Sequence, residues 1–145
     1  PEPPEKIRRY KLLNFVARWL SLRLVATPVM EIMFGQKFMA DPERAELREE
    51  WRRRLLANDR IGITRAVKGV IHRAGVNDQL EAITVPTLII VGDQDVTLEP
   101  AESESMHASI PDSRLVIIPG AGHTSTVEEP EAVNAAISEF LAGLD

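Results

Sequence analysis

The sequence predicts an α/β fold that is incomplete: a helical segment followed by two parallel strands and their helices. Two apolar runs, 88–91 and 115–118, are continuous rather than alternating, which is typical of strands covered by helices on both faces. A helix is expected between them and another after them, so the connection is a right-handed parallel crossover. We therefore divide the chain into a helical segment, 1–75, and an α/β segment, 76–145.

The helical segment begins with an apolar-dense run over 6–26 and a short, methionine-rich helix over 28–38 that Gly35 breaks. Asp41 and Pro42 then start a helix as N-cap and first helical residue. Its apolar stripe is Leu47, Trp51 and Leu55. Asn58 or Asp59 caps the next helix. Its expected buried face is Ile63, Ala66, Val67, Val70 and Ile71. Asn77 is expected to cap one more short helix, 78–83.

In the α/β segment, the helix between the strands is expected over 99–110, with Met106 and Ile110 facing inward. The last helix is expected to begin at Pro130 and to end at Gly143. Its expected buried residues are Val133, Ile137, Phe140 and Leu141.

Composition excludes several classes of function. The net charge of −5 argues against a nucleic-acid partner, because phosphate binding requires a basic face. The apolar runs are shorter than the roughly 20 residues that cross a bilayer, and the first residues lack the apolar core of a signal peptide. The chain has no cysteine, which fits a reducing compartment. A cytoplasmic location is therefore expected.

Each predicted strand ends at glycine and then presents one proton-handling side chain. Asp95 follows the first strand, and His123 follows the second within Gly-Ala-Gly-His. A carboxylate and an imidazole delivered in this way are two of the three members of a nucleophile–base–acid triad. The third is missing, because no serine lies in Gly-x-Ser-x-Gly.

Two parallel strands do not make a complete domain. Leaving about six strand side chains uncovered would cost on the order of 10 kcal/mol, which is comparable with the whole stability of an ordinary domain. We therefore expect a complementary N-terminal segment, or a second copy of the chain in a homodimer, to cover the open edge of the sheet.

The segments 83–95, 110–123 and 128–137 together resemble the C-terminal part of an α/β-hydrolase. They are most similar to the branch that includes 3-oxoadipate enol-lactonases, esterases and haloperoxidase-like enzymes. The close resemblance covers 76–145, and the helices before it are similar in kind to the family's cap, or lid. The family's nucleophile elbow and oxyanion hole lie on earlier strands, which this sequence lacks.

The resemblance implies that Asp95 is the triad acid and His123 the base of a serine hydrolase acting on a small carboxylic ester or lactone, without a cofactor. The chain alone is then expected to be inactive. Acyl transfer or perhydrolysis on the same triad remains open. The sequence departs from the family at Leu98 and Glu99, where a small residue or proline is common.

Other side chains have simpler interpretations. Asp93, the rival to Asp95, is expected to form a turn, and His72 and His107 are expected to be structural or solvated. Ser103 and Ser105 are expected on an exposed helix, and Ser125 on the wrong element for a nucleophile. The histidine spacing predicts no metal site.

A methionine- and phenylalanine-rich cluster is a candidate wall for the acyl group under the cap. Its members are Met30, Met33, Phe34 and Phe38, with Met39 beside them. Plain packing of the cap helices is the competing interpretation. Trp19 and Trp51 are expected in the core first and in a substrate wall second.

A second hypothesis belongs to a different class. The chain would be a non-catalytic interaction module, or a domain-swapped subunit derived from an α/β-hydrolase. The pairing of Asp95 with His123 argues against it, because a binding module needs neither.

Overall fold

The computed structural model of the chain describes residues 3–144. Its internal contacts divide it into two compact units. The first contains the residues up to Met30 together with Ala45–Gly75, and the second contains Glu31–Arg44 together with the residues from Val76 onward. The segment Glu31–Arg44 therefore packs with the strands, although it lies inside the stretch 1–75. The division of the chain into a cap and a core at residue 75 stays a prediction.

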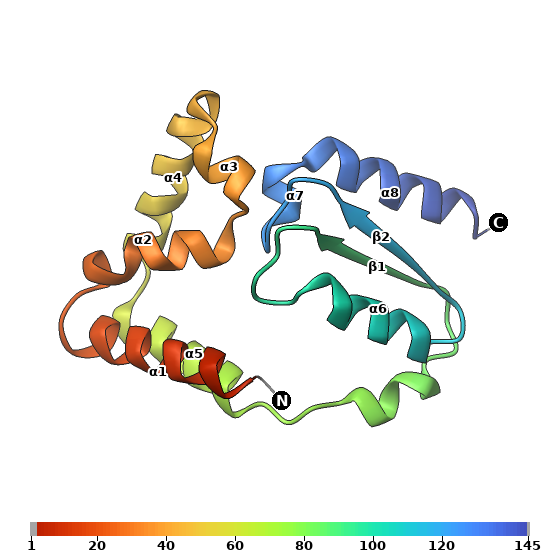
Figure 1. Cartoon of the computed structure of the whole chain (residues 1–145), viewed down its shortest axis with the longest axis horizontal. Coiled ribbons are helices and arrows are strands. Elements are labelled where there is room, and N and C mark those ends of the chain that lie inside the picture. The colour runs from red at the N-terminus through yellow and green to blue at the C-terminus, as the bar shows by residue number, and fades with distance from the viewer. Residues whose placement is uncertain (1–2, 145) are drawn as a thin grey trace. The chain divides into compact units, whose positions relative to one another are not determined.

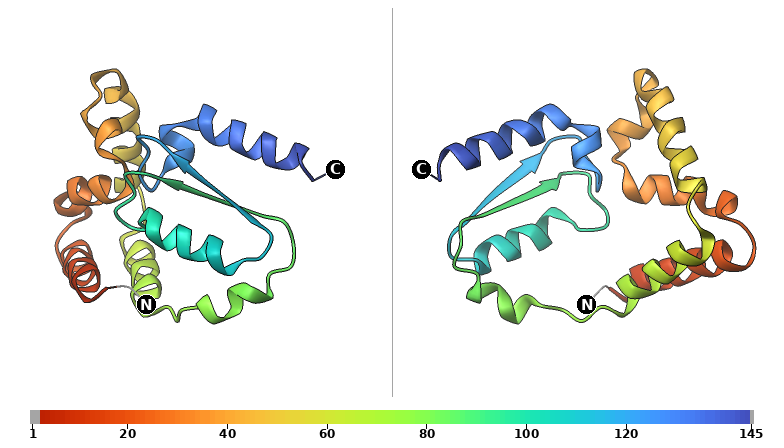
Figure 2. Two further views of the ribbon diagram at one scale, coloured as in Figure 1. Left: turned by 45° about the vertical axis from the view of Figure 1, so that its right-hand side comes forward. Right: turned by 180° about the vertical axis from the view of Figure 1, so that it is seen from behind.

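The first unit consists of helices. They are α1 (Pro4–Trp19), most of α2 (Leu22–Met33), α4 (Ala45–Leu56) and α5 (Arg60–His72). Helices α1 and α5 lie side by side in both views of Figure 2. Of the two candidate caps for α5, Asp59 is the one that acts: its Oδ1 accepts a hydrogen bond from the Gly62 amide at 2.6 Å.

The apolar run 6–26 spans two helices, since α1 ends at Trp19 and α2 begins at Leu22. The sequence predicts that Pro28 begins a helix, but it lies inside α2 instead. Burial of Val25, Ala26 and Met30 around it outweighs the hydrogen bond that proline cannot donate. The predicted break at Gly35 is confirmed, because Gly35 caps α3 (Gln36–Ala40).

Burial in the first unit is lower than the apolar patterns predict. Trp19 is 68% exposed instead of lying in the core, with the Arg18 guanidinium 5.8 Å from its ring centroid. Val70, expected on the buried face of α5, is 40% exposed, and the residue that α5 buries is Thr64. Helical spacing identifies a helix correctly, but it does not say how much of the apolar stripe a neighbour covers.

The second unit is built on a two-stranded parallel sheet. Strands β1 (Thr87–Gly92) and β2 (Ser113–Ile118) pair in register, from Thr87 opposite Ser113 to Gly92 opposite Ile118. The crossover helix α6 (Pro100–Ser109) lies on one face of the sheet and α8 (Pro130–Ala142) on the other (Figure 1). The predicted parallel crossover is confirmed.

Each face of the sheet has a small core. Ile89 packs with Leu80 and Ile110 on the α6 side. Ile118 packs with Ala121 and Val133 on the α8 side. Ile110 and Val133 are therefore buried as predicted.

Three inward-facing predictions are wrong. Met106 is 38% exposed, Ile137 39% and Leu141 57%. The reason is the width of the sheet: two strands about 4.8 Å apart cannot cover the whole inner stripe of a helix. Ile117, on β2, is also exposed, at 40%.

Short elements complete the unit. The expected helix 78–83 is a 3-10 helix, η2 (Asn77–Ala82), which no side chain caps, so Asn77 is not its N-cap. Asp41 begins the 3-10 helix η1 (Pro42–Arg44) ahead of α4, and its Oδ1 accepts a hydrogen bond from the Glu43 amide. Helix α7 (Ser125–Glu128), which the sequence did not predict, follows His123. Within residues 3–144, no helix is long and apolar enough to cross a membrane.

Candidate active site

The two predicted site residues meet at the carboxyl ends of the strands. His123 Nδ1 lies 2.8 Å from Asp95 Oδ2. Because β1 and β2 are parallel and adjacent, the loops that follow them emerge at the same edge of the sheet. Asp95 is buried, whereas 29% of the His123 side chain is exposed. The carboxylate is thus sequestered, and the imidazole is partly accessible.

Asp95 uses both of its oxygens. Oδ1 accepts hydrogen bonds from the amides of Thr97, at 2.7 Å, and Leu98, at 2.9 Å, while Oδ2 faces the imidazole. Burial disfavours the charged form of Asp95, but the hydrogen bond from His123 and those two amides outweigh it and lower the pKa. An ionised carboxylate only accepts, so His123 Nδ1 carries the proton of this bond. In the neutral imidazole, Nε2 then keeps a lone pair.

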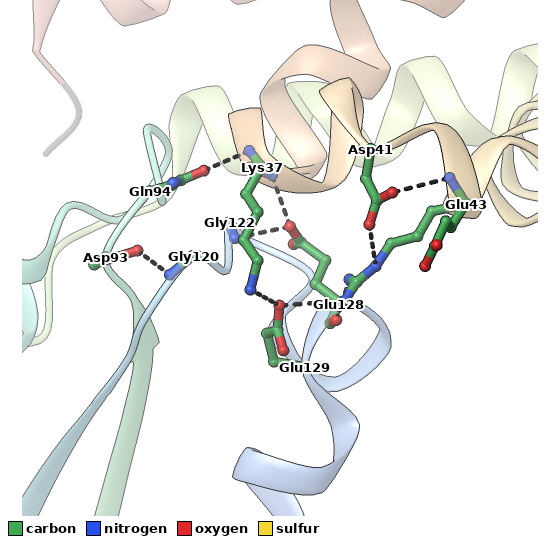
Figure 3. Close-up of polar contacts among 11 residues, drawn as sticks. Lys37, Asp41, Glu43, Asp93, Gln94, Gly120, Gly122, Glu128 and Glu129 are labelled. Carbon is green, nitrogen blue, oxygen red and sulfur yellow. Dashed lines mark hydrogen bonds and ion pairs between the residues drawn. The ribbon is translucent and has the colours of Figure 1, made fainter.

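The two strand-end loops are bonded to each other. Asp93 Oδ1 accepts a hydrogen bond from the Gly120 amide at 2.6 Å (Figure 3), and the Gln94 amide donates to the Ala121 carbonyl at 2.9 Å. A Cβ on Gly92 would lie 2.1 Å from that carbonyl oxygen, so only glycine fits. Asp93, the rival acid, therefore holds the loops together and bonds to backbone.

A second carboxylate, which sequence reasoning missed, contacts the loop that carries His123. This loop, residues 119–124 between β2 and α7, is called the imidazole loop below. Glu128 is 1% exposed, and its Oε2 accepts hydrogen bonds from the amides of Gly35, at 2.7 Å, and Gly122, at 2.9 Å. Its Oε1 accepts from the Thr124 amide at 3.1 Å. The sequence Glu128-Glu129 does not indicate which of the two carboxylates is buried. The only signal is that both lie just before Pro130, at the end of a short helix.

The segment Glu31–Arg44 reaches the same loops. Thr124 Oγ1 donates to the Met33 carbonyl at 2.6 Å, and the Lys37 amide donates to Gln94 Oε1 at 2.9 Å (Figure 3). Lys37 Nζ also pairs with Glu129 at 2.8 Å. Arg44 donates to the Glu128 carbonyl. This segment is therefore part of the site's framework.

A cleft of about 900 Å³ opens beside Asp95. Of the four residues predicted as a substrate wall, Phe34 lines it, and so does the neighbouring Met39. Phe38 is fully buried, stacked on Phe34 with ring centroids 4.7 Å apart, and Met30 is 4% exposed. Met30 and Phe38 are therefore packed in the interior, while Met33 is half-buried. A substrate-binding role for the four residues Met30, Met33, Phe34 and Phe38 stays a prediction.

The remaining candidates have structural surroundings. His107 Nδ1 lies 2.7 Å from Ser113 Oγ, which joins the end of α6 to β2. Ser103 is 7% exposed, contrary to the expectation of an exposed helix position, because it lies on the face of α6 toward the sheet. Among residues 3–144, no three histidine, aspartate or glutamate side chains are grouped as metal ligands.

The loop after Asp95 holds the departure from the hydrolase pattern at Leu98 and Glu99. Leu98 supplies one of the amides that bind Asp95, and Glu99 is the N-cap residue of α6. Because the contact to Asp95 is made by the Leu98 backbone, the leucine side chain does not disturb it.

Known proteins of similar sequence and structure are hydrolases and related enzymes. The chain is 30% identical to a thermophilic esterase from Thermogutta terrifontis, with a TM-score of 0.84 over 99% of this chain and 52% of the esterase. An enol-lactonase from Burkholderia xenovorans LB400 shares the fold, with a TM-score of 0.82 at 22% identity over 92% of this chain and 50% of that one. Both are matched by their C-terminal halves, so this is the C-terminal part of an α/β-hydrolase fold.

Among curated proteins, a Bacillus subtilis (strain 168) protein described as a "Putative 2-succinyl-6-hydroxy-2,4-cyclohexadiene-1-carboxylate synthase" is 31% identical over 95% of this chain and 46% of its own length. A "Putative carbamate hydrolase RutD" from Escherichia coli is 34% identical over 51% of this chain and 28% of its own length. The chain thus spans less than half of these curated relatives. The pattern that defines the Ndr family matches residues 9–145. The chain belongs to the Ndr family, within the α/β-hydrolase superfamily.

Proposed function

We propose that this chain supplies the acid and the base of a serine hydrolase that cleaves a carboxylic ester or lactone. The nucleophile would come from a segment that is not among these 145 residues. The observation that carries the proposal is the pair formed by Asp95 and His123, with the acid fixed by two backbone amides on the side away from the imidazole.

The chemistry follows from the protonation state of the pair. In the first step, His123 Nε2 takes the proton of a serine hydroxyl as its oxygen attacks the ester carbonyl, and Asp95 stabilises the imidazolium. The imidazolium then protonates the departing alkoxide, which leaves as an alcohol. Nε2 next removes a proton from water as its oxygen attacks the acyl-enzyme. When the tetrahedral intermediate collapses, the imidazolium returns this proton to the serine oxygen, which releases the acid and restores the serine hydroxyl.

The proposal includes a partner for the sheet. A complementary N-terminal hydrolase segment would add strands beside β1 and bring the nucleophile to the carboxyl ends. Exposed apolar side chains at Ile117, Ile137 and Leu141 support a covering polypeptide, because burying each would stabilise the assembly by about 1–2 kcal/mol.

A chimera tests the proposal. The N-terminal half of the Thermogutta terrifontis esterase would be fused ahead of this chain, and a chimera that melts cooperatively would be assayed with p-nitrophenyl acetate and p-nitrophenyl butyrate. Ester hydrolysis is expected above the rate of the 145-residue chain alone. His123→Ala should reduce kcat/KM by about 10³-fold or more.

Matched variants make the assay specific. His107→Ala removes an imidazole that also bonds a hydroxyl, and Asp93→Asn alters the neighbouring carboxylate; both should retain most of the activity that His123→Ala and Asp95→Asn lose. Undiminished hydrolysis by the His123→Ala chimera would exclude the proposed role of the imidazole.

The alternative is a non-catalytic module that uses the same exposed surface to form a homodimer. The apolar side chains exposed on α8 and β2 are compatible with it. Sedimentation equilibrium of the chain distinguishes the two: a stable dimer, together with an inactive chimera, favours the module, and a monomer with an active chimera favours the hydrolase.

A further inference from the structure

The proposed triad chemistry leaves one buried ionisable group unused. Glu128 lies five residues after His123 and is the most deeply buried carboxylate among the described residues, at 1% exposed. A buried charge is costly unless hydrogen bonds satisfy it. The identity of its partners therefore indicates what the group does.

The Glu128 carboxylate accepts hydrogen bonds from three backbone amides, and two of them flank the imidazole. Gly122 immediately precedes His123, and Thr124 immediately follows it; their amides lie 2.9 Å and 3.1 Å from the two carboxylate oxygens. A carboxylate that bonds the residues on both sides of His123 restricts the backbone torsions that aim its side chain. Figure 3 shows Glu128 with its oxygens toward the Gly122 amide.

The third amide comes from a different part of the second unit. Gly35, between α2 and α3, donates to Glu128 Oε2 at 2.7 Å. The approach is close, because a Cβ on Gly122 would lie 2.3 Å from the Gly35 nitrogen. The same carboxylate therefore joins the imidazole loop to the segment that supplies Phe34 to the cleft.

The adjacent carboxylate behaves differently. Glu129 Oε1 pairs with the side chains of Lys37, at 2.8 Å, and Arg44, at 3.3 Å. Those bonds join side chains at a partly exposed surface. Glu128 and Glu129 have the same chemistry and are neighbours in the chain, yet the Glu128 carboxylate bonds the backbone that aims the imidazole.

We propose that Glu128 is a positioning residue for His123: its carboxylate, bonded to the amides of Gly35, Gly122 and Thr124, holds the imidazole with Nδ1 toward Asp95. This proposal rests on the proposed function only in one respect, namely that the orientation of the His123 ring serves catalysis. The orientation itself is a property of the 145-residue chain.

Glutamine at this position is the informative replacement. It keeps the shape of glutamate, but one oxygen becomes an NH2 group that donates and cannot accept. Whichever way the amide is turned, at least one of the three backbone N–H groups faces another donor. Glu128→Gln should therefore release one side of the imidazole loop without creating a cavity.

The experiment is NMR of the histidine ring in the 145-residue chain labelled with ¹⁵N-histidine. In the wild type, the His123 ring is expected as the Nδ1–H tautomer, with a low-field Nδ1 proton bonded to Asp95. In Glu128→Gln, that proton signal should be lost to exchange, and Nδ1 and Nε2 should shift toward the values of a mixed-tautomer histidine. Glu129→Gln is the matched control, and its His123 spectrum should equal that of the wild type.

A Glu128→Gln chain with wild-type ring shifts and an intact low-field proton overturns the proposal. Amide spectra of β1 and β2 check that each variant is folded. If Glu128→Gln fails to fold, amide hydrogen exchange of the wild-type chain tests the proposal instead. The amides of Gly122 and Thr124 should then be protected to about the same degree as the ladder amides of β1, and exchange at the rate of an open loop overturns the proposal.

These outcomes are separate from those of the proposed function. An active His123→Ala chimera would remove the imidazole from catalysis and leave the NMR result unchanged. Conversely, a wild-type spectrum in Glu128→Gln would remove the positioning role and leave the triad proposal standing.

Discussion

The two units of the chain keep their elements in place by different means. In the second unit, buried carboxylates bond backbone amides, as Asp95 does with Thr97 and Leu98 and Glu128 does with Gly122. In the first unit, the described contacts are mainly helix caps and half-buried stripes, and large side chains such as Trp19 remain exposed. The strand-end loops of the second unit are thus fixed by directional hydrogen bonds, whereas the helices of the first unit depend on caps and on partly buried apolar stripes.

The largest contrast is expected from removing one aromatic ring in each unit. Phe38 is fully buried against Phe34 and has the Arg44 guanidinium 5.5 Å from its ring centroid, so Phe38→Ala should lower the free energy of unfolding by about 3–5 kcal/mol. Trp19 is 68% exposed, so Trp19→Ala should change it by no more than about 0.5 kcal/mol. Urea denaturation of both variants measures the difference. Equal losses would mean that Trp19 is covered in solution, for example by a second chain.

Glycine substitutions extend the comparison to the backbone. A Cβ on Gly92 would meet the Ala121 carbonyl, so Gly92→Ala should destabilise the chain by about 1–3 kcal/mol or more. A Cβ on Gly69, inside α5, would meet nothing within 4 Å beyond its own stretch of helix, and Gly69→Ala should stabilise the chain by about 0.5–1 kcal/mol. Thermal denaturation should show a lower melting temperature for Gly92→Ala and a higher one for Gly69→Ala. A stabilising Gly92→Ala would contradict the close approach of the two strand-end loops.

The cap of α5 gives a smaller effect. Asp59→Ala removes the hydrogen bond to the Gly62 amide and should cost about 1 kcal/mol, while Asp59→Asn, which can still accept that bond, should cost less. Far-UV circular dichroism during urea denaturation reports both. An unchanged midpoint in Asp59→Ala would show that α5 is stable without help from its cap.

The smallest expected effect is one of pH. The Asp95 pKa is lowered despite burial, so its ionisation stabilises the folded state above the unfolded pKa of about 3.9, and this contribution is lost as the pH falls through the folded pKa. The pKa of Glu129 is lowered mainly by its bond to Lys37. The substitution Lys37→Met should therefore return the Glu129 pKa toward its usual range and leave the Asp95 pKa low. A ¹³C-carboxyl titration of the variant measures both pKa values. A joint rise of both would mean that Lys37 acts on Asp95 as well.

The features that could be predicted from the sequence are those encoded in short contiguous motifs. The strands were identified because their apolar runs are continuous, and Asp95 and His123 because each follows a strand within a few residues of glycine. Burial of Met106, Ile137 and Trp19 was predicted wrongly, because it depends on neighbours that helical spacing does not specify. Glu128 was missed for a related reason: one of its donors, Gly35, is 93 positions away in the sequence.

The bonds of the Asp95 carboxylate also have a consequence for the order of folding. Two of the partners, Thr97 and Leu98, follow Asp95 closely in the chain, while His123 is 28 residues later. Short loops close at little entropic cost, so the turn formed by residues 95–98 can form as soon as it leaves the ribosome. The imidazole joins only when β2 pairs with β1. The acceptor can thus be ordered before strand pairing brings its donor to it.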